Sequence, residues 1–150
     1  MVTKKTAVLI GSAALAAAVA ASYAKRPVKP LSGVLAVNRD PARLKPEFRT
    51  RLMRVLRAMR RRGFKPYLWE GYRTPQRTKL LVERGVGIPD SLHMKGLAAD
   101  VVDKSTAPDY WKGSRAFWTA LGQETRKAGL TWGGDFKRKP DRVHLQMRRA

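Results

Sequence analysis

Apolar residues recur with helical spacing over 46–62 and 114–127, and a Thr-Pro start predicts a further helix over 75–84. Glycine follows the segments 46–62 and 114–127, at Gly63 and Gly129, as expected of helix ends. The apolar stripes predict that the helices over 46–62 and 114–127 each bury one face. The side chains expected to face the core are Phe48, Leu52, Leu56, Met59, Phe117, Trp118 and Leu121.

Strands are predicted where aromatic and apolar residues cluster or alternate between turn signals. The last of them alternates: Val143 and Leu145 fall on one face, and His144 and Gln146 on the other. Helices and strands are mixed without a regular alternation, which predicts an α+β fold with a small, mainly antiparallel sheet and flanking helices. The segments predicted as strands are 64–72, 97–102, 130–132 and 142–147.

The N-terminal segment is apolar and precedes the folded part. Residues 6–24 form a run of 19 uncharged residues, nine of them alanine, between two pairs of basic residues. This pattern is typical of a cleaved export signal or an uncleaved signal anchor, and a buried helix is the alternative. We therefore expect an N-terminal hydrophobic helix in a signal or anchor segment at 1–24, a linker at 25–33 and one domain at 34–150.

The charge is strongly positive along the whole chain. The sequence of 150 residues contains 32 Lys+Arg and 11 Asp+Glu, a formal net charge of +21. Residues 31–150 alone carry 27 basic and 11 acidic side chains, a balance of 27 − 11 = +16. Such a charge indicates an anionic partner, either the cell envelope or a nucleic acid. The arginines of 49–62 are spread around their helix, so the pattern favours the envelope over specific nucleic-acid binding.

The candidate chemistry depends on two histidines. The chain has no cysteine and only His93 and His144, so a thiolate metal site or a cysteine nucleophile is excluded. A hydrolytic zinc site takes three protein ligands and keeps one position open. His93, Asp100 and His144 would supply two imidazoles and a carboxylate, with Asp100 and His144 on neighbouring strands. Asp141, three residues before His144, would then act as a general base beside the metal.

The motifs resemble those of the M15 zinc peptidases. The matching stretches are Ser91-x-His93 with Asp100, Asp141-x-x-His144, Gly71-Tyr-Arg73-Thr with Gln76, and Trp-Gly-Gly-Asp at 132–135. The family includes D,D- and L,D-carboxypeptidases and phage L-alanyl-D-glutamate endopeptidases. The resemblance covers about 34–147 and implies a fold like that of the D,D-peptidases and the hedgehog domain.

Roles for single residues follow from this resemblance. It implies that His93, Asp100 and His144 bind Zn²⁺ and that Asp141 is the general base. It also implies that Arg73 stabilises the oxyanion, while Ser91, Gln76 and Trp132 are weaker candidates for substrate contact. The final acid is Asp where many relatives have Glu, and the Asp form resembles the phage endopeptidase branch.

The expected function is a zinc-dependent hydrolase of peptidoglycan stem peptides, with the L-Ala–D-Glu bond as the first choice. A D,D- or L,D-carboxypeptidase of wall remodelling is the alternative. Two other classes stay open, a non-catalytic wall-peptide binder and a basic nucleic-acid-binding protein. We expect a monomer that is exported to the periplasm or tethered to the inner membrane through residues 6–24. The weakly apolar leader resembles that of phage endolysins that are released from a membrane anchor.

Overall fold

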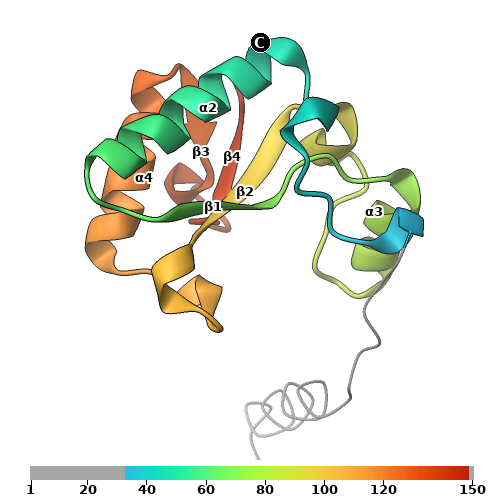
Figure 1. Ribbon diagram of the computed structural model, residues 1–150. Coiled ribbons are helices and arrows are strands. Elements are labelled where there is room, and N and C mark those ends of the chain that lie inside the picture. Colours follow the sequence, from blue (N-terminus) through green and yellow to red (C-terminus); the bar gives the residue numbers. More distant parts are fainter. Residues whose placement is uncertain (1–32, 149–150) are drawn as a thin grey trace, which may run out of the picture. The chain divides into compact units, whose positions relative to one another are not determined.

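The computed structural model describes residues 33–148, so the predicted leader and most of the predicted linker lie outside the described part (Figure 1). This part holds three α-helices and four β-strands, which confirms the predicted α+β class. The helices are α2 (Pro46–Arg61), α3 (Pro75–Glu83) and α4 (Arg115–Lys127); the strands are β1 (Pro66–Glu70), β2 (Ala98–Asp103), β3 (Leu130–Trp132) and β4 (His144–Met147). Within residues 33–148 no helix is long and apolar enough to span a bilayer.

The helix boundaries follow the local signals in the sequence. Thr74 caps α3 by accepting a hydrogen bond from the Arg77 amide, and Ser114 caps α4 by accepting one from Phe117. Gly63 and Gly129 both have positive φ, at 85° and 72°. Each stands just beyond a helix end, a position that favours glycine.

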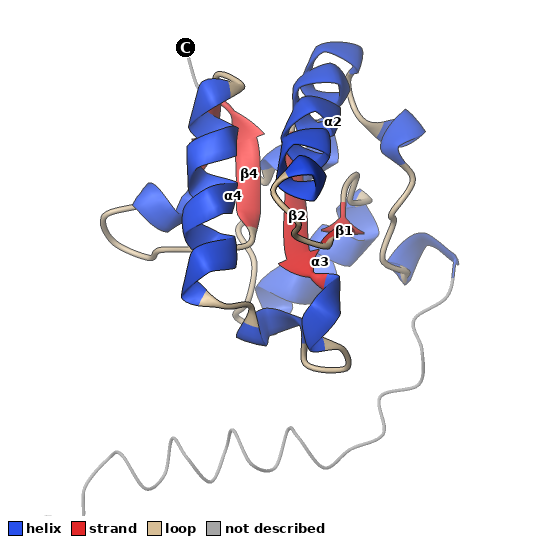
Figure 2. Ribbon diagram, turned by 60° about the vertical axis from the view of Figure 1, so that its left-hand side comes forward, coloured by secondary structure: helices blue, strands red, loops and turns tan. Residues whose placement is uncertain are grey.

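The four strands form one antiparallel sheet in the order β1-β2-β4-β3. Helices α2 and α4 pack together, and the core lies between them and one face of the sheet (Figures 1 and 2). Leu68 of β1, Val101 of β2 and Leu145 of β4 supply this face, because alternate residues of a strand point to opposite sides. All seven side chains predicted to face the core are buried.

A β-bulge in β1 changes the direction of one acidic side chain. Leu68 pairs with Val101, but Glu70 pairs with Asp100, so two residues of β1 advance the ladder by one position on β2. Without this extra residue Glu70 would lie on the same face as Leu68. With it, Glu70 shares the face of Asp100, opposite the helix-covered core.

Candidate metal centre

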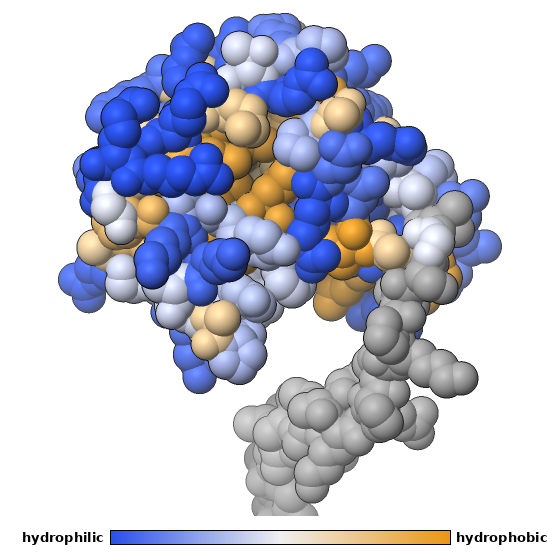
Figure 3. All heavy atoms as spheres, viewed as in Figure 1, coloured by the Kyte–Doolittle hydropathy of each residue, from blue (hydrophilic) through white to orange (hydrophobic). Residues whose placement is uncertain are grey.

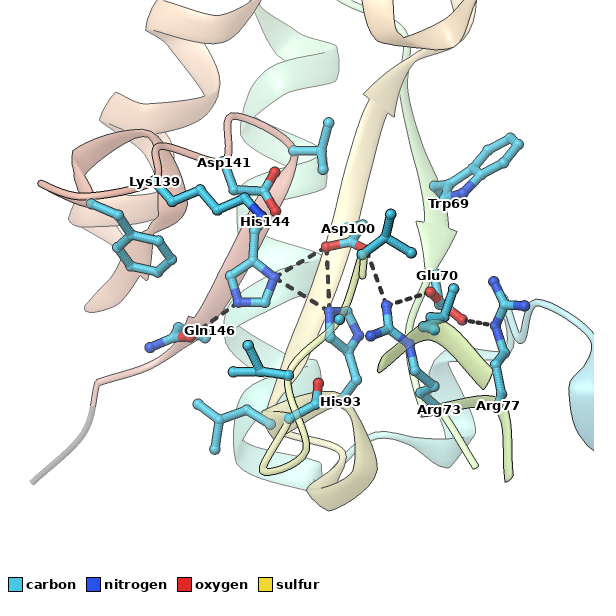
Figure 4. Close-up of a pocket in the computed structure, with 18 of the residues that line it drawn as sticks. Trp69, Glu70, Arg73, Arg77, His93, Asp100, Lys139, Asp141, His144 and Gln146 are labelled. Atoms are coloured by element: carbon cyan, nitrogen blue, oxygen red, sulfur yellow. Dashed lines mark hydrogen bonds and ion pairs between the residues drawn. The ribbon is translucent and has the colours of Figure 1, made fainter. Parts of the chain in front are cut away.

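Two predicted ligands meet because they are direct cross-strand partners. Asp100 of β2 pairs with His144 of β4 in the antiparallel ladder, so their side chains leave neighbouring strands on the same face. Figure 4 shows both side chains in front of the sheet, with the helices behind it. The alternation that directs Leu145 into the core thus directs His144 and Gln146 to the opposite face.

The third predicted ligand comes from a short 3-10 helix, Leu92–Lys95, that precedes β2. Gly96 ends this helix in a left-handed conformation, with φ of 66°. A Cβ at Gly96 would lie only 3.1 Å from both the Arg43 carbonyl oxygen and the Lys45 nitrogen, so glycine also permits close backbone packing. This turn places His93, which is buried, beside Asp100 and His144.

The three donor atoms form a nearly regular triangle. His93 Nε2 lies 3.3 Å from Asp100 Oδ1 and 3.3 Å from His144 Nδ1, and His144 Nδ1 lies 3.1 Å from Asp100 Oδ1. Ligands held about 2.0–2.1 Å from a tetrahedral zinc ion are separated by about 3.3 Å. The triangle therefore matches three corners of such a site.

The outer nitrogens of both imidazoles donate hydrogen bonds, which determines what the inner nitrogens can do. His93 Nδ1 donates to the Gly71 carbonyl oxygen at 2.7 Å, and His144 Nε2 donates to Gln146 Oε1 at 3.0 Å. The inner nitrogens then present lone pairs to each other and to the Asp100 carboxylate. Three electron-rich atoms this close together repel one another unless a proton or a metal ion lies between them, and the donor set fits a metal ion.

The charges of the site agree with this requirement. Burial alone would raise the pKa of Asp100, but His93 and His144 hold that pKa well below its ordinary value. Burial opposes protonation of His144, yet its hydrogen bond to Asp100 raises the His144 pKa. The buried carboxylate is thus ionised and attracts positive charge into the triangle.

Arg73 is held beside the triangle by the redirected Glu70. Its Nη2 lies 2.5 Å from Glu70 Oε2 and 3.7 Å from Asp100 Oδ2, and its side chain is buried (Figure 4). Glu70 also pairs through Oε1 with Nε of Arg77, whose Nη1 donates to the Leu35 carbonyl oxygen at 3.0 Å. Among the described residues 33–148, the buried Nε–H of Arg73 finds no hydrogen-bond partner. This cost in free energy is expected of a functional rather than a structural arginine.

Asp141 lies on the cavity wall beside His144, in the loop that leads into β4 (Figure 4). Partial loss of hydration raises the pKa of Asp141, and the nearby charge of Asp100 raises it further. The Asp141 amide donates to the Gly133 carbonyl oxygen at 2.8 Å. A Cβ at Gly133 would overlap the Asp141 carbonyl oxygen and lie 2.9 Å from His144 Cβ, so only glycine permits this approach.

The site opens into a cavity of about 600 Å³. Ser91 is buried and lines this cavity, as expected of a substrate contact. Gln76 is exposed in the first turn of α3 and does not line it. Trp132 does not line it either, because its indole packs over Gly122 and donates to the Arg142 carbonyl oxygen at 2.8 Å. The structure therefore brings together His93, Asp100, His144, Asp141, Arg73 and Ser91.

Sequence reasoning gave no site role to three residues that support the site. Gln146 orients His144, and Glu70 with Arg77 fixes Arg73. The role of Gln146 could have been predicted, because residues two apart in a strand share a face and Gln146 is two residues from His144. Glu70 carried no such signal, because its direction depends on the bulge.

Comparisons with known proteins show what this chain resembles. A family model described as D-alanyl-D-alanine carboxypeptidase matches residues 84–147. No curated protein matches the chain significantly.

Solved structures give a broader match. The L-Ala D-Glu endopeptidase ChiX of Serratia marcescens is 26% identical, with a TM-score of 0.55 over 72% of this chain and 83% of ChiX. The LD-carboxypeptidase LdcB is 20% identical, with a TM-score of 0.54 over 69% of this chain and 58% of LdcB.

The third similar structure is a Zn(II) complex. It is a mutant of the vancomycin resistance D,D-pentapeptidase VanY, 16% identical, with a TM-score of 0.56 over 83% of this chain and 80% of VanY. At this identity VanY supports the similarity of the fold to that of D,D-peptidases. The family model, which matches residues 84–147, and ChiX, at 26% identity, show that the chain is similar to the M15 peptidases, which are metallopeptidases.

Proposed function

We propose that this chain is a zinc-dependent peptidase that cleaves an amide bond in the stem peptides of peptidoglycan. The observation that carries the proposal is the triangle of His93 Nε2, Asp100 Oδ1 and His144 Nδ1, with sides of 3.1–3.3 Å, at a cavity that also holds Arg73 and Asp141. The similar structures support a peptidoglycan substrate. ChiX is an L-Ala D-Glu endopeptidase and VanY is a D,D-pentapeptidase. LdcB is an LD-carboxypeptidase described in terms of peptidoglycan recognition.

His93, Asp100 and His144 would hold the zinc ion. Two imidazoles with one carboxylate is a donor set of catalytic zinc sites, although Fe(II) oxygenases use it too. The Zn(II) complex of VanY supports zinc. When bound, zinc acts as a Lewis acid toward the amide carbonyl and lowers the pKa of water to about 7.

Asp141 and Arg73 supply the remaining chemistry. Asp141 accepts a proton from the attacking water at its carboxylate and returns that proton to the leaving amine. The raised pKa of Asp141 brings its affinity for the proton closer to what this transfer needs. Arg73 donates charge-assisted hydrogen bonds to the oxygen that becomes negative as the amide is attacked. Glu70 and Arg77 keep the Arg73 side chain in place, so that it does not have to reorganise during the reaction.

We place the cut at the L-Ala–D-Glu bond. ChiX, an L-Ala D-Glu endopeptidase, is 26% identical over most of its own length, and the Asp form of the final acid resembles the endopeptidase branch. The alternative is a D,D- or L,D-carboxypeptidase, which the description of the family model and LdcB support.

We propose an exported enzyme retained at the anionic envelope, with residues 6–24 as its signal or anchor and a role in phage lysis as the first choice. Hydrophilic side chains dominate the surface over α2 (Figure 3), and seven arginines lie in this helix or directly after it, within residues 49–62. This helix covers the sheet face opposite the metal triangle. The enzyme can therefore bind an anionic surface through α2 without blocking its cavity.

The test uses the purified full-length chain, with zinc, on isolated peptidoglycan. New N-terminal D-Glu is the expected product, whereas released D-Ala would identify a carboxypeptidase. If the wild-type protein and the His144→Ala variant release the same ends at the same rate, the enzymatic proposal is wrong. Zinc analysis of the purified protein should give one ion per chain.

A further inference from the structure

The cavity has an apolar rim that the proposed chemistry does not use. Among residues 33–148, the large hydrophobic side chains that are strongly exposed are Val86, Ile88 and Trp111, at 67%, 59% and 53%. All three line the cavity that contains the metal triangle. Exposed apolar side chains gathered at a cavity indicate contact with a ligand.

The side of this rim formed by Trp111 is held in position by other aromatic rings. Trp111 contacts Trp69 edge to face, with ring centroids 5.6 Å apart, and Trp69 contacts Tyr110 at 5.4 Å. The Arg39 guanidinium lies over the Trp69 ring, 4.8 Å from its centroid. Trp111 thus presents a large exposed indole with its direction already fixed, which lowers the entropy cost of binding.

The proposed substrate peptide offers no matching group near the cut. L-Ala has only a methyl group, and D-Glu has a carboxylate. The lactyl group of N-acetylmuramic acid, however, is joined directly to L-Ala. The lactyl bridge and one alanine, together at most about 7 Å long, then separate the scissile amide from the pyranose ring. A pyranose ring has an apolar face of C–H groups that packs on an indole.

We propose that Trp111, supported by Trp69, binds the N-acetylmuramic acid ring that carries the stem peptide. The inference rests on the proposed function and deepens it, because it makes the glycan-linked stem the substrate rather than the free peptide. The rim is continuous with the metal cavity, so peptide and sugar can bind together. Trp111 is then a specificity-determining residue. It contacts the sugar, whereas other residues of the cavity break the bond.

The experiment compares two substrates that differ only in the sugar: the disaccharide tetrapeptide and the N-lactyl tetrapeptide, whose peptides both begin with L-Ala–D-Glu. The wild-type chain is expected to give a kcat/KM roughly fivefold higher for the sugar-linked substrate. In Trp111→Ala that ratio falls to about 1, whereas Trp111→Phe keeps most of it. Lys112→Ala, on the same short helix but outside this cavity, is the matched control and keeps the wild-type ratio.

A binding measurement makes the test independent of turnover. In an Asp141→Asn background, calorimetry should show weaker binding of the disaccharide tetrapeptide when Trp111 is replaced by Ala. Equal wild-type rates on the two substrates, with no change in Trp111→Ala, would overturn the inference but leave the peptidase proposal intact. Failure to cleave either substrate would instead count against the peptidase proposal. If Trp111→Ala loses only sedimentation with phosphatidylglycerol vesicles, the rim binds lipid and the sugar inference is wrong.

Discussion

The two faces of the sheet use the same three strands in opposite ways. Toward α2 and α4, Leu68, Val101 and Leu145 are buried among apolar side chains. On the other face, Glu70, Asp100 and His144 are largely buried too, but each contacts another polar or charged group. Neighbouring positions of a strand therefore serve stability on one face and chemistry on the other.

The comparison shows how a small domain supports a costly polar site. Burial of ionisable groups costs free energy unless each is paired, and the inner atoms of the triangle are paired only when a cation is present. The helix-covered face supplies hydrophobic stabilisation that does not depend on a metal. We thus expect changes on the site face to affect function more than folding, and changes on the core face to do the reverse.

The largest effect is expected from loss of a ligand. His144→Ala should lower kcat/KM by about 10³-fold or more and remove stoichiometric zinc, because a metal ion supplies several kcal/mol of transition-state stabilisation. Asp141→Asn is the matched variant: it should lower kcat by roughly 10²–10⁴-fold and retain zinc. Metal analysis and peptidoglycan hydrolysis check both. Loss of zinc from Asp141→Asn would show that Asp141 is a ligand rather than the base.

Truncation of a core side chain should lower the stability of the fold and leave zinc binding intact. Phe117 is fully buried and contacts Phe64 edge to face at 5.8 Å. Phe117→Ala should lower the free energy of unfolding by about 3–5 kcal/mol, while the folded protein still binds one zinc ion. Thr119→Ala, exposed on the same helix, should change it by less than about 0.5 kcal/mol. Denaturant titration measures both, and equal effects of the two variants would refute the assigned core.

An intermediate effect is expected where the polar face contributes to stability. Glu70→Gln removes the charge that Arg73 and Arg77 share, and should cost about 1.5–3 kcal/mol of unfolding free energy. Glu47→Gln is the matched control, because Glu47 pairs with Arg51 in an exposed contact worth less than about 1 kcal/mol. Glu70→Gln should also lower kcat while zinc stays bound. Unchanged kcat would mean that Arg73 does not need Glu70 for its position.

The smallest effect concerns pH. A hydrogen bond from Lys127, together with Arg62, holds the pKa of Glu124 below its ordinary value, with both nitrogens 3.0 Å from Oε1. A depressed folded-state pKa means that the pairing stabilises the protein above about pH 4.5 and is lost as pH falls through the folded-state pKa. Glu124→Gln should cost about 1 kcal/mol or less at pH 7, and less as the pH falls through the folded-state pKa of Glu124. A difference that stays constant over this range would exclude charge as its source.

The sequence was sufficient for the features that depend on periodicity and caps. The three helices and the four strands follow from apolar spacing and from alternation along each strand. The triangle was predictable because so few residues of the chain can ligate a metal through an imidazole.

The features that the sequence did not predict depend on three-dimensional contacts. The bulge that turns Glu70 toward Asp100 is a property of the pairing between two strands, and no local motif marks it. Trp132 was only a weak candidate for substrate contact, and packing was equally open from the sequence. Its ring packs over Gly122, which only the relative placement of α4 and β3 determines. The strand order β1-β2-β4-β3 likewise depends on which edges meet.

The close approach at Gly133 has a consequence for how this protein can diversify. The contact of Gly133 with Asp141 holds the two ends of the loop over residues 134–140 together, shortly before β4 begins at His144. Lys137, Arg138, Lys139 and Pro140 are exposed between them. Length and composition can therefore change within this span while Asp141, the proposed general base, keeps its place, since loop closure costs little for each added residue. The loop is a natural position for insertions that retarget the enzyme to another wall polymer.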